Sequence, residues 1–169
     1  MKIRLVYLLT TLLCVSGFQL TSIAQSNKTE IKVLAQSADL ILIGKVSERN
    51  SRWNKDNTRI YTDVTINVDE YLKGNGTNDK IIVTTLGGEV GEVGEFYTHV
   101  PRFDEEENVL IFLTYDQRDM SYRVLNGEDG KLTLYEDNIT GEKITPSNTK
   151  ISSLKNEIKN FVKKQWCVQ

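Results

Sequence analysis

The segment from Thr58 to Gly74, TRIYTDVTINVDEYLKG, alternates between apolar and polar side chains. Val64, Ile66 and Val68 are apolar, and the residues between them are polar. Successive side chains of an extended chain point to opposite faces, so this alternation is typical of a strand. The segment therefore predicts a long β-strand with one face in water, which ends at the turn-forming residues 74–76, Gly-Asn-Gly.

Other apolar segments predict further strands. Residues 40–43 form a continuous apolar run with Val46 beyond it, which is typical of a strand buried on both faces. Gly44 within this run predicts a bend or bulge. The polar segment 51–57, SRWNKDN, predicts a loop. More strands are expected at 80–86 (KIIVTTL), 95–100 (EFYTHV), 108–115 (NVLIFLTY, central), 121–127 (SYRVLNG) and 131–137 (KLTLYED), with turns at NGEDG and DNITGE.

Two segments have helical rather than strand-like spacing. Residues 29–37 predict a short helix before the first strand. Residues 148–166 predict a C-terminal helix, because the apolar side chains fall on one helical face: Ile151, Leu154, Ile158, Phe161 and Val162. We expect this face to pack on the sheet rather than on a membrane surface. The predicted fold is mainly β with flanking helices, a small β-barrel with a C-terminal helix.

The N-terminal residues have the pattern of a secretory signal peptide. Lys2 and Arg4 precede a short apolar core, and the Ser-Ile-Ala sequence before Gln25 predicts cleavage after Ala24. The apolar run is shorter than the roughly 20 residues that cross a bilayer. We therefore expect residues 1–24 to be removed and residues 25–169 to form a single domain, secreted or periplasmic, without stable membrane insertion.

The expected mature chain is mildly acidic and has one cysteine. Removing residues 1–24 leaves 19 basic and 23 acidic residues, a net charge of −4. This charge gives no basic field for nucleic acid, so no nucleic-acid partner is predicted. Cys167 has no intrachain partner, so the fold must rest on its hydrophobic core. The thiol either pairs between chains or is inert.

The segment 84–115 contains the features that could carry chemistry. Gly88, Gly91 and Gly94 are spaced like a phosphate loop, but they alternate with glutamates and no helix pattern follows, so phosphate binding is excluded. The acidic run 104–107 lacks the alternate spacing of a calcium loop and predicts a solvated turn. His99 is the only histidine and is expected on a partly exposed strand. No metal and no cofactor are predicted.

The common catalytic motifs are absent from the sequence. No Gly-x-Ser-x-Gly and no His-Glu-x-x-His sequence occurs. Cys167, close to the C-terminus, is an unlikely nucleophile. We therefore predict a non-enzymatic protein. The alternative is a metal-dependent or acid-residue hydrolase that uses the acids of loop 87–107.

A family resemblance follows from the order of several short motifs. SADLILIGKVSER, a long strand ending in VDEYLKG, then KIIVTT, a glycine-bearing loop and NVLIFL together resemble the N-terminal domain of tissue inhibitors of metalloproteinases and netrin-like modules, over residues 34–113. The chain also resembles secreted bacterial domains with GG-x-V-G and P-R-F before an apolar strand. The resemblance implies an OB-fold, a five-stranded Greek-key barrel. In that family an N-terminal cysteine binds the protease zinc, whereas no cysteine lies near Gln25, so no zinc-directed residue is assigned.

The predicted function is a secreted binding module. Small barrels bind through their loops and one sheet face, and loop 87–107 is longer than most connections. The candidate binding residues are Arg52, Trp53, Glu92, Phe96, Tyr97 and Phe103. The alternative for the aromatic residues is structural: Trp53 caps the barrel mouth, and Phe96 and Phe103 fill it. The expected partner is an extracellular or periplasmic protein, with proteases as the class that the resemblance implies.

Overall fold

The computed structural model describes residues 22–166. The predicted signal sequence up to residue 21 and Cys167 therefore lie outside the described residues. The chain divides into two units, residues 1–33 and residues 34–169. Helix α2 (Ser22–Ser37) crosses this division, and all strands belong to the second unit. No helix within residues 22–166 combines the length and apolar character that a membrane span requires.

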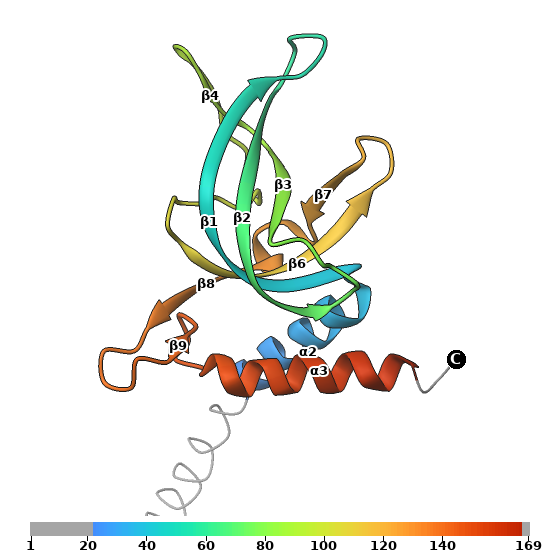
Figure 1. Cartoon of the computed structure of the whole chain (residues 1–169), viewed down its shortest axis with the longest axis vertical. Coiled ribbons are helices and arrows are strands. Elements are labelled where there is room, and N and C mark those ends of the chain that lie inside the picture. The colour runs from blue at the N-terminus through green and yellow to red at the C-terminus, as the bar shows by residue number, and fades with distance from the viewer. Residues whose placement is uncertain (1–21, 167–169) are drawn as a thin grey trace, which may run out of the picture. The chain divides into compact units, whose positions relative to one another are not determined.

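The second unit is mainly β, with helices at both ends of its sequence (Figure 1). After α2 the strands follow in this order: β1 (Leu40–Trp53), β2 (Ile60–Lys73), β3 (Lys80–Leu86), β4 (Gly88–Val90), β5 (Val93–Glu95), β6 (Asn108–Asp116), β7 (Ser121–Val124), β8 (Lys131–Glu136) and β9 (Lys143–Ile144). A 3₁₀ helix, η1 (Gly127–Gly130), separates β7 from β8, and helix α3 (Ile151–Trp166) follows β9.

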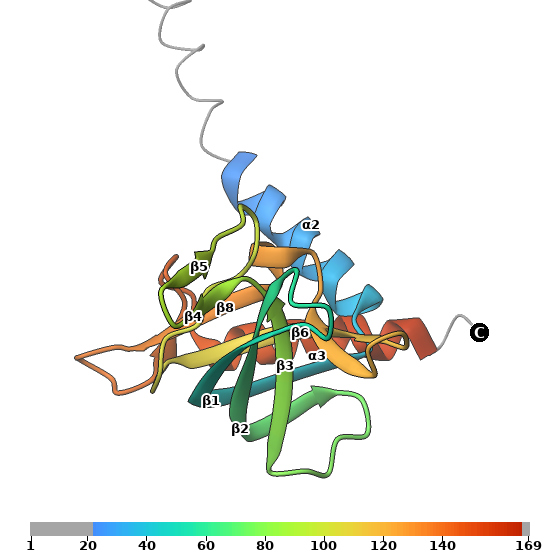
Figure 2. The same cartoon turned by 90° about the horizontal axis from the view of Figure 1, so that it is seen from above.

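The long strands β1 and β2 organise the sheet. β1 pairs antiparallel with β2 over almost its full length and with β6 over Leu40–Lys45. β3 pairs antiparallel with β2 and has one parallel bridge to β7, from Val83 to Tyr122. The resulting order is β1-β2-β3-β7-β6-β8-β9, with the additional β1–β6 pairing. Figure 2 shows β1, β2 and β3 side by side, with the separate β4–β5 hairpin next to them.

The predicted bulge in β1 is present at Gly44. The β1–β2 register shifts between Ile43 and Gly44. A Cβ atom at Gly44 would lie 2.3 Å from the carbonyl oxygen of Asn67 on β2. Only a glycine permits this close approach of the two backbones, and bulges of this kind increase the twist and bend of a strand.

The core lies between β1, β2 and β6. The predicted alternation of β2 is confirmed, because Ile60, Thr62, Val64 and Ile66 are buried and the side chains between them are less so. Strand β6 is central, as predicted, with every residue from 109 to 113 buried. One core cluster combines the following residues: Leu40, Leu42, Val46, Val64, Ile66, Val83, Phe103, Val109, Ile111 and Leu113.

Helix α3 confirms the predicted C-terminal helix but begins three residues later. Leu154 and Ile158 are buried, as expected for its apolar face. Glu70 of β2 forms ion pairs with Lys155 and, at 2.8 Å, with Lys159. The helix begins at Ile151 because Asn148 has a left-handed φ of 64° and closes a turn with Thr145.

Three local predictions were wrong. Residues 51–53 belong to β1 rather than to a loop, because Arg52 pairs with Tyr61 and its guanidinium donates to Asp63 at 2.6 Å. Residues 96–100 form no strand; the extended pieces are β4 and β5, and His99 lies exposed in a turn with a φ of 62°. The NGEDG segment does not reverse the chain. β7, before η1, and β8, after it, both pair antiparallel with β6, so the two strands run in the same direction.

Candidate functional site

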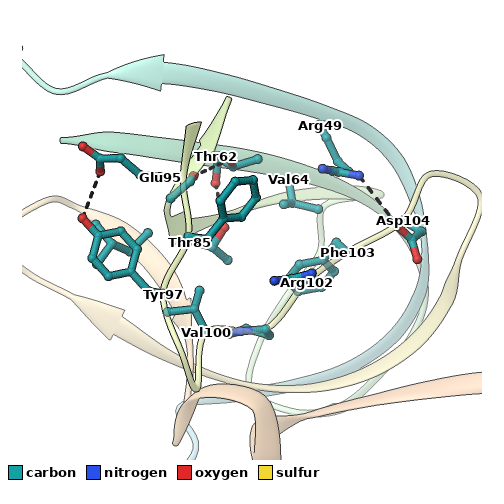
Figure 3. A pocket seen from close by; sticks show the side chains of 15 residues that line it. Arg49, Thr62, Val64, Thr85, Glu95, Tyr97, Val100, Arg102, Phe103 and Asp104 are labelled. Atoms are coloured by element: carbon teal, nitrogen blue, oxygen red, sulfur yellow. Dashed lines mark hydrogen bonds and ion pairs between the residues drawn. The ribbon is translucent and has the colours of Figure 1, made fainter. Parts of the chain in front are cut away.

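The candidate site is an open pocket of about 250 Å³ (Figure 3). One wall is formed by β2 and β3 and includes Thr62, Val64 and Thr85. The opposite wall is the segment 95–104, which leads from β5 back towards β6. Arg49 of β1 also lines the pocket. The lining combines apolar and polar side chains on a framework of strands, which is the usual character of a binding site.

Small polar side chains take the place of core residues on the strand wall. Thr62 lies in the inward-facing row of β2, but its hydroxyl donates to the carbonyl of Gly87 at 2.7 Å and lies 2.9 Å from the Ser51 hydroxyl. A Cβ atom at Gly88 would lie 2.2 Å from Thr62 Oγ1, and Gly88 has a φ of 129°. Glycine is therefore required where the chain leaves β3 and crosses β1 and β2.

A hydrogen-bonded group holds the start of the opposite wall. Glu95 Oε2 accepts from the backbone N–H of Ile60 at 3.0 Å and from the Tyr97 hydroxyl at 3.0 Å. Tyr97 in turn accepts from Arg59 Nη1 at 2.8 Å. These bonds tie the end of the β4–β5 hairpin to the start of β2. Glu95 is thus committed to structural hydrogen bonds.

The mouth of the pocket presents an exposed aromatic ring with a cation close to it. Phe96 is 66% exposed, and the Arg102 guanidinium lies 5.7 Å from its ring centroid, within the range of a cation–π interaction. Arg102 has no acidic partner among the described residues. Arg49 makes a long contact of 3.8 Å with Asp104, whose side chain is 90% exposed. The mouth therefore offers two weakly engaged cations beside an apolar ring.

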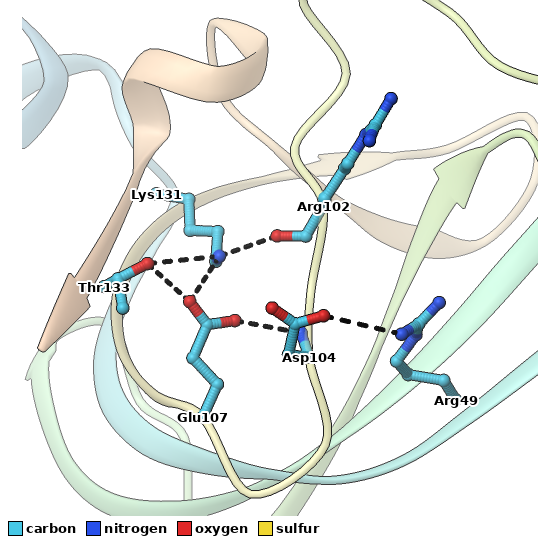
Figure 4. A network of polar contacts seen from close by, with 6 residues as sticks. All are labelled: Arg49, Arg102, Asp104, Glu107, Lys131 and Thr133. Carbon is cyan, nitrogen blue, oxygen red and sulfur yellow. Dashed lines mark hydrogen bonds and ion pairs between the residues drawn. The ribbon is translucent and has the colours of Figure 1, made fainter.

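A nearly buried ion pair fixes the wall from behind (Figure 4). Lys131 of β8 donates to Glu107 Oε1 and to the backbone carbonyl of Arg102, both at 2.6 Å. Glu107 also accepts from Thr133 and from the backbone N–H of Asp104, and both charged side chains are 10% exposed. The network thus holds the backbone carbonyl of Arg102 and the backbone N–H of Asp104, on both sides of Phe103. The Phe103 ring centroid lies 4.9 Å from Lys131 Nζ.

The electrostatics of this network favour the charged form of Glu107. Burial raises the pKa of its carboxyl group, but hydrogen bonds from Lys131, Thr133 and the Asp104 backbone outweigh burial and lower the pKa below its ordinary value. An ionised carboxylate facing a lysine at low exposure is a structural element, because both of its oxygens are already occupied.

The acids of loop 87–107 do not converge. Asp104, Glu106 and Glu107 face three different cations, Arg49, Lys45 and Lys131 respectively. Within residues 22–166 no group of three or more metal-ligating side chains comes together.

The structure separates the predicted binding residues into two sets. Phe96, Tyr97 and Phe103 line the pocket, whereas Arg52, Trp53 and Glu92 do not. Phe103 is only 4% exposed and packs in the core cluster, so just its pocket-facing side can meet a ligand.

Sequence reasoning missed the cations and the strand wall of the pocket. Arg49 and Arg102 both line it, and so does Thr62. The available signals were a threonine at an inward position of an alternating strand and an arginine between Pro101 and Phe103.

No family model and no curated protein matches the chain.

Proposed function

We propose that this chain is a non-enzymatic binding domain that takes up an anchor side chain of a protein partner in the pocket between β2–β3 and segment 95–104. The supporting scaffold is a small OB-like barrel. The pocket lies beside Thr62, the one polar residue in the buried row of β2 from Ile60 to Ile66.

The strand pairings support the barrel. β1 pairs with β2, β2 with β3, β3 with β7, β7 with β6, and β6 again with β1, so that the pairings return to their starting strand. A ring of five paired strands is what an OB-fold has, although the single bridge between β3 and β7 leaves that side partly open. The likeness to netrin-like modules and metalloproteinase inhibitors is part of this proposal and rests on the sequence motifs.

The observation that carries the proposal is the exposed Phe96 at the mouth of a small pocket. A volume of about 250 Å³ lies below the ~300–1,000 Å³ of sites for drug-sized molecules and suits one inserted side chain. Protein interfaces concentrate their binding energy in anchors that fill such pockets, with aromatic and arginine residues most prominent. Phe96 and Arg102 place both residue types at the rim.

A hydrolase using the acids of loop 87–107 has less support. The three acids that form ion pairs there point to separate cations, and Glu95 is held by two hydrogen bonds. A hydrolytic site needs such groups to converge on one reacting atom. For a secreted or periplasmic chain, as the N-terminal sequence predicts, the partner would be a protein of the same compartment.

The test is selection of ligands from a displayed library of random peptides on immobilised protein. We expect enrichment of peptides with a common apolar anchor on the wild type. The same peptides should bind at least tenfold more weakly to Phe96→Ala. The matched control is Ile139→Ala, which removes a 93% exposed apolar side chain in the turn after β8 and should bind like the wild type. Failure to enrich any peptide, or equal binding to Phe96→Ala, would contradict the proposal.

A further inference from the structure

The charged side chains at the pocket differ in how far each is already paired. Arg49 and Arg102 line the pocket, and Arg59 lies against Tyr97 at its edge. Two carboxylates, Glu95 and Asp104, also line it. The lining itself therefore holds two arginines and two carboxylates, which differ in how far their charges are already engaged. Glu95 accepts two hydrogen bonds and Asp104 lies 3.8 Å from Arg49, whereas the Arg102 guanidinium has no carboxylate partner among the described residues.

The backbone of Arg102 is held in place, while its guanidinium has no carboxylate partner among the described residues. Its backbone carbonyl accepts from Lys131, and its side chain lies near the ring of Phe96, while no carboxylate of the described residues pairs with it. The planar guanidinium has five N–H donors whose geometry matches a carboxylate. An exposed arginine that lies beside an aromatic ring and has no carboxylate partner is suited to an anion that carries an apolar neighbour.

The strand wall also leaves the N–H and C=O of Leu86 without a strand partner among the described residues. Gly87 N–H donates to Ile60 O at 2.8 Å, and Val68 N–H donates to Asp79 O at 2.8 Å. These two bonds identify which residue pairs between β2 and β3 are hydrogen-bonded and which are not. Leu86 pairs with Tyr61 at a position without ladder hydrogen bonds, so its N–H and C=O point away from β2. The β3–β7 bridge lies three residues earlier, at Val83, and Leu86 lines the pocket. An extended peptide can pair with the N–H and C=O of Leu86.

We propose that the ligand is an extended peptide that presents a carboxylate to Arg102 and inserts the adjacent apolar side chain between Phe96 and the strand wall. This inference rests on the proposed binding function and adds the chemistry of the ligand. The carboxylate comes either from a peptide C-terminus or from an Asp or Glu side chain. Arg49 lies on the same pocket and contributes a second positive charge.

The experiment uses the full mature chain and three synthetic peptide libraries of equal length. The first has free C-terminal carboxylates, the second has C-terminal amides, and the third has amides and omits Asp and Glu. Binding is measured on the wild type, Arg102→Gln, Phe96→Ala and Arg118→Gln. Arg118 is the matched control, because it is an exposed arginine in the β6–β7 turn and does not line the pocket.

We expect the third library to bind at least tenfold more weakly than the best of the other two, and Arg102→Gln to lose tenfold or more while Arg118→Gln keeps wild-type affinity. Loss on amidation alone would assign the carboxylate to the C-terminus, and retention in the second library would assign it to a side chain. Equal binding of all libraries that still depends on Phe96 would overturn the carboxylate inference and leave the proposed function standing. Binding in no library, or binding that ignores both Phe96 and Arg102, would overturn both.

Discussion

The two halves of β1 lie in opposite surroundings. Over Leu40–Val46 the strand is bordered by β2 and by β6 or the residues just before it, and all side chains but that of Lys45 are buried. Over Ser47–Trp53 it pairs with β2 alone, and no side chain is buried. Glu106 and Glu107, just before β6, still form backbone hydrogen bonds with Val46, and the pocket wall 95–104 precedes them in the chain.

This difference shows where the molecule can carry a binding surface. Burial of large apolar side chains is the main source of stability, so the first half of β1 tolerates little change. The second half lies beside the pocket, where Thr62 and Ser51 replace large apolar residues. Substitutions there should alter binding more than folding. Five predictions test this division, starting with the largest expected effect on stability.

Leu42→Ala and Ser51→Ala compare the two halves directly. Leu42 is fully buried in the core cluster, so its truncation should lower the free energy of unfolding by about 2–5 kcal/mol. Ser51→Ala removes one half-buried hydroxyl contact with Thr62 and should cost about 0.5–1.5 kcal/mol. Urea unfolding followed by circular dichroism measures both. Similar losses in the two variants would break the division.

Lys131→Met tests whether the buried ion pair between Lys131 and Glu107 stabilises the fold. Removal of the cation leaves Glu107 without its charge partner at low exposure and should lower the free energy of unfolding by about 2–3 kcal/mol.

Hydrogen exchange of the Asp104 amide measures how far Glu107 holds the pocket wall. In Glu107→Ala the Asp104 amide loses its acceptor and should exchange faster, whereas in Glu107→Gln it keeps an acceptor.

The same pair gives a pH dependence with a definite sign. The pKa of Glu107 is lower in the folded chain than in the unfolded chain, because Lys131 and Thr133 outweigh its burial. The contribution of the Glu107 carboxylate to the free energy of unfolding is therefore complete above the unfolded pKa of about 4.3, and it is lost as the pH falls through the lower folded pKa. The stability difference between wild type and Lys131→Met should shrink below about pH 4. A constant difference from pH 3 to pH 7 would argue against the ion pair as its cause.

Glu70→Gln is expected to have a smaller effect. Glu70 lies opposite Ile43, beside the buried half of β1, and its partly exposed carboxylate pairs with Lys155 and Lys159 of α3. Pairs of this exposure contribute about 0.2–1 kcal/mol each and weaken in salt. The variant should lower the melting temperature at low ionic strength and approach wild type in 1 M NaCl. Asp69→Asn, which loses one pair with Lys143 on β9, is the control that leaves α3 untouched.

The sequence predicted what depends on local pattern. Strand β3 was placed at its observed bounds, and β2 and β6 were recognised from alternation and from a continuous apolar run. Residues 51–53 were missed because polar residues continue a strand only where a partner such as Tyr61 pairs with them, and pairing is not a local property.

The pocket could not be predicted because it depends on contacts between distant residues. Gly88 meets Thr62 and Ser51 across the sheet, and Lys131 reaches back to Arg102. Phe96 and Phe103 were both named as candidates, yet one is exposed and the other buried. The sequence alone does not indicate whether an aromatic residue in a long loop will be buried or exposed.

Phe96→Ala has the smallest expected effect on stability, and it tests directly whether the rim of the pocket is free of the core. The ring is largely exposed and its contact with Arg102 is a surface cation–π interaction, so the free energy of unfolding should change by less than about 0.5 kcal/mol. Phe103→Ala, seven residues later, removes a buried ring and should cost about 3–5 kcal/mol. Parallel urea titrations and peptide binding on the two variants separate the cases. If Phe96→Ala unfolds as readily as Phe103→Ala, the rim of the pocket is part of the core and is not free for a ligand. If Phe96→Ala folds normally and loses binding, the exposed ring is retained for recognition, because folding does not require it.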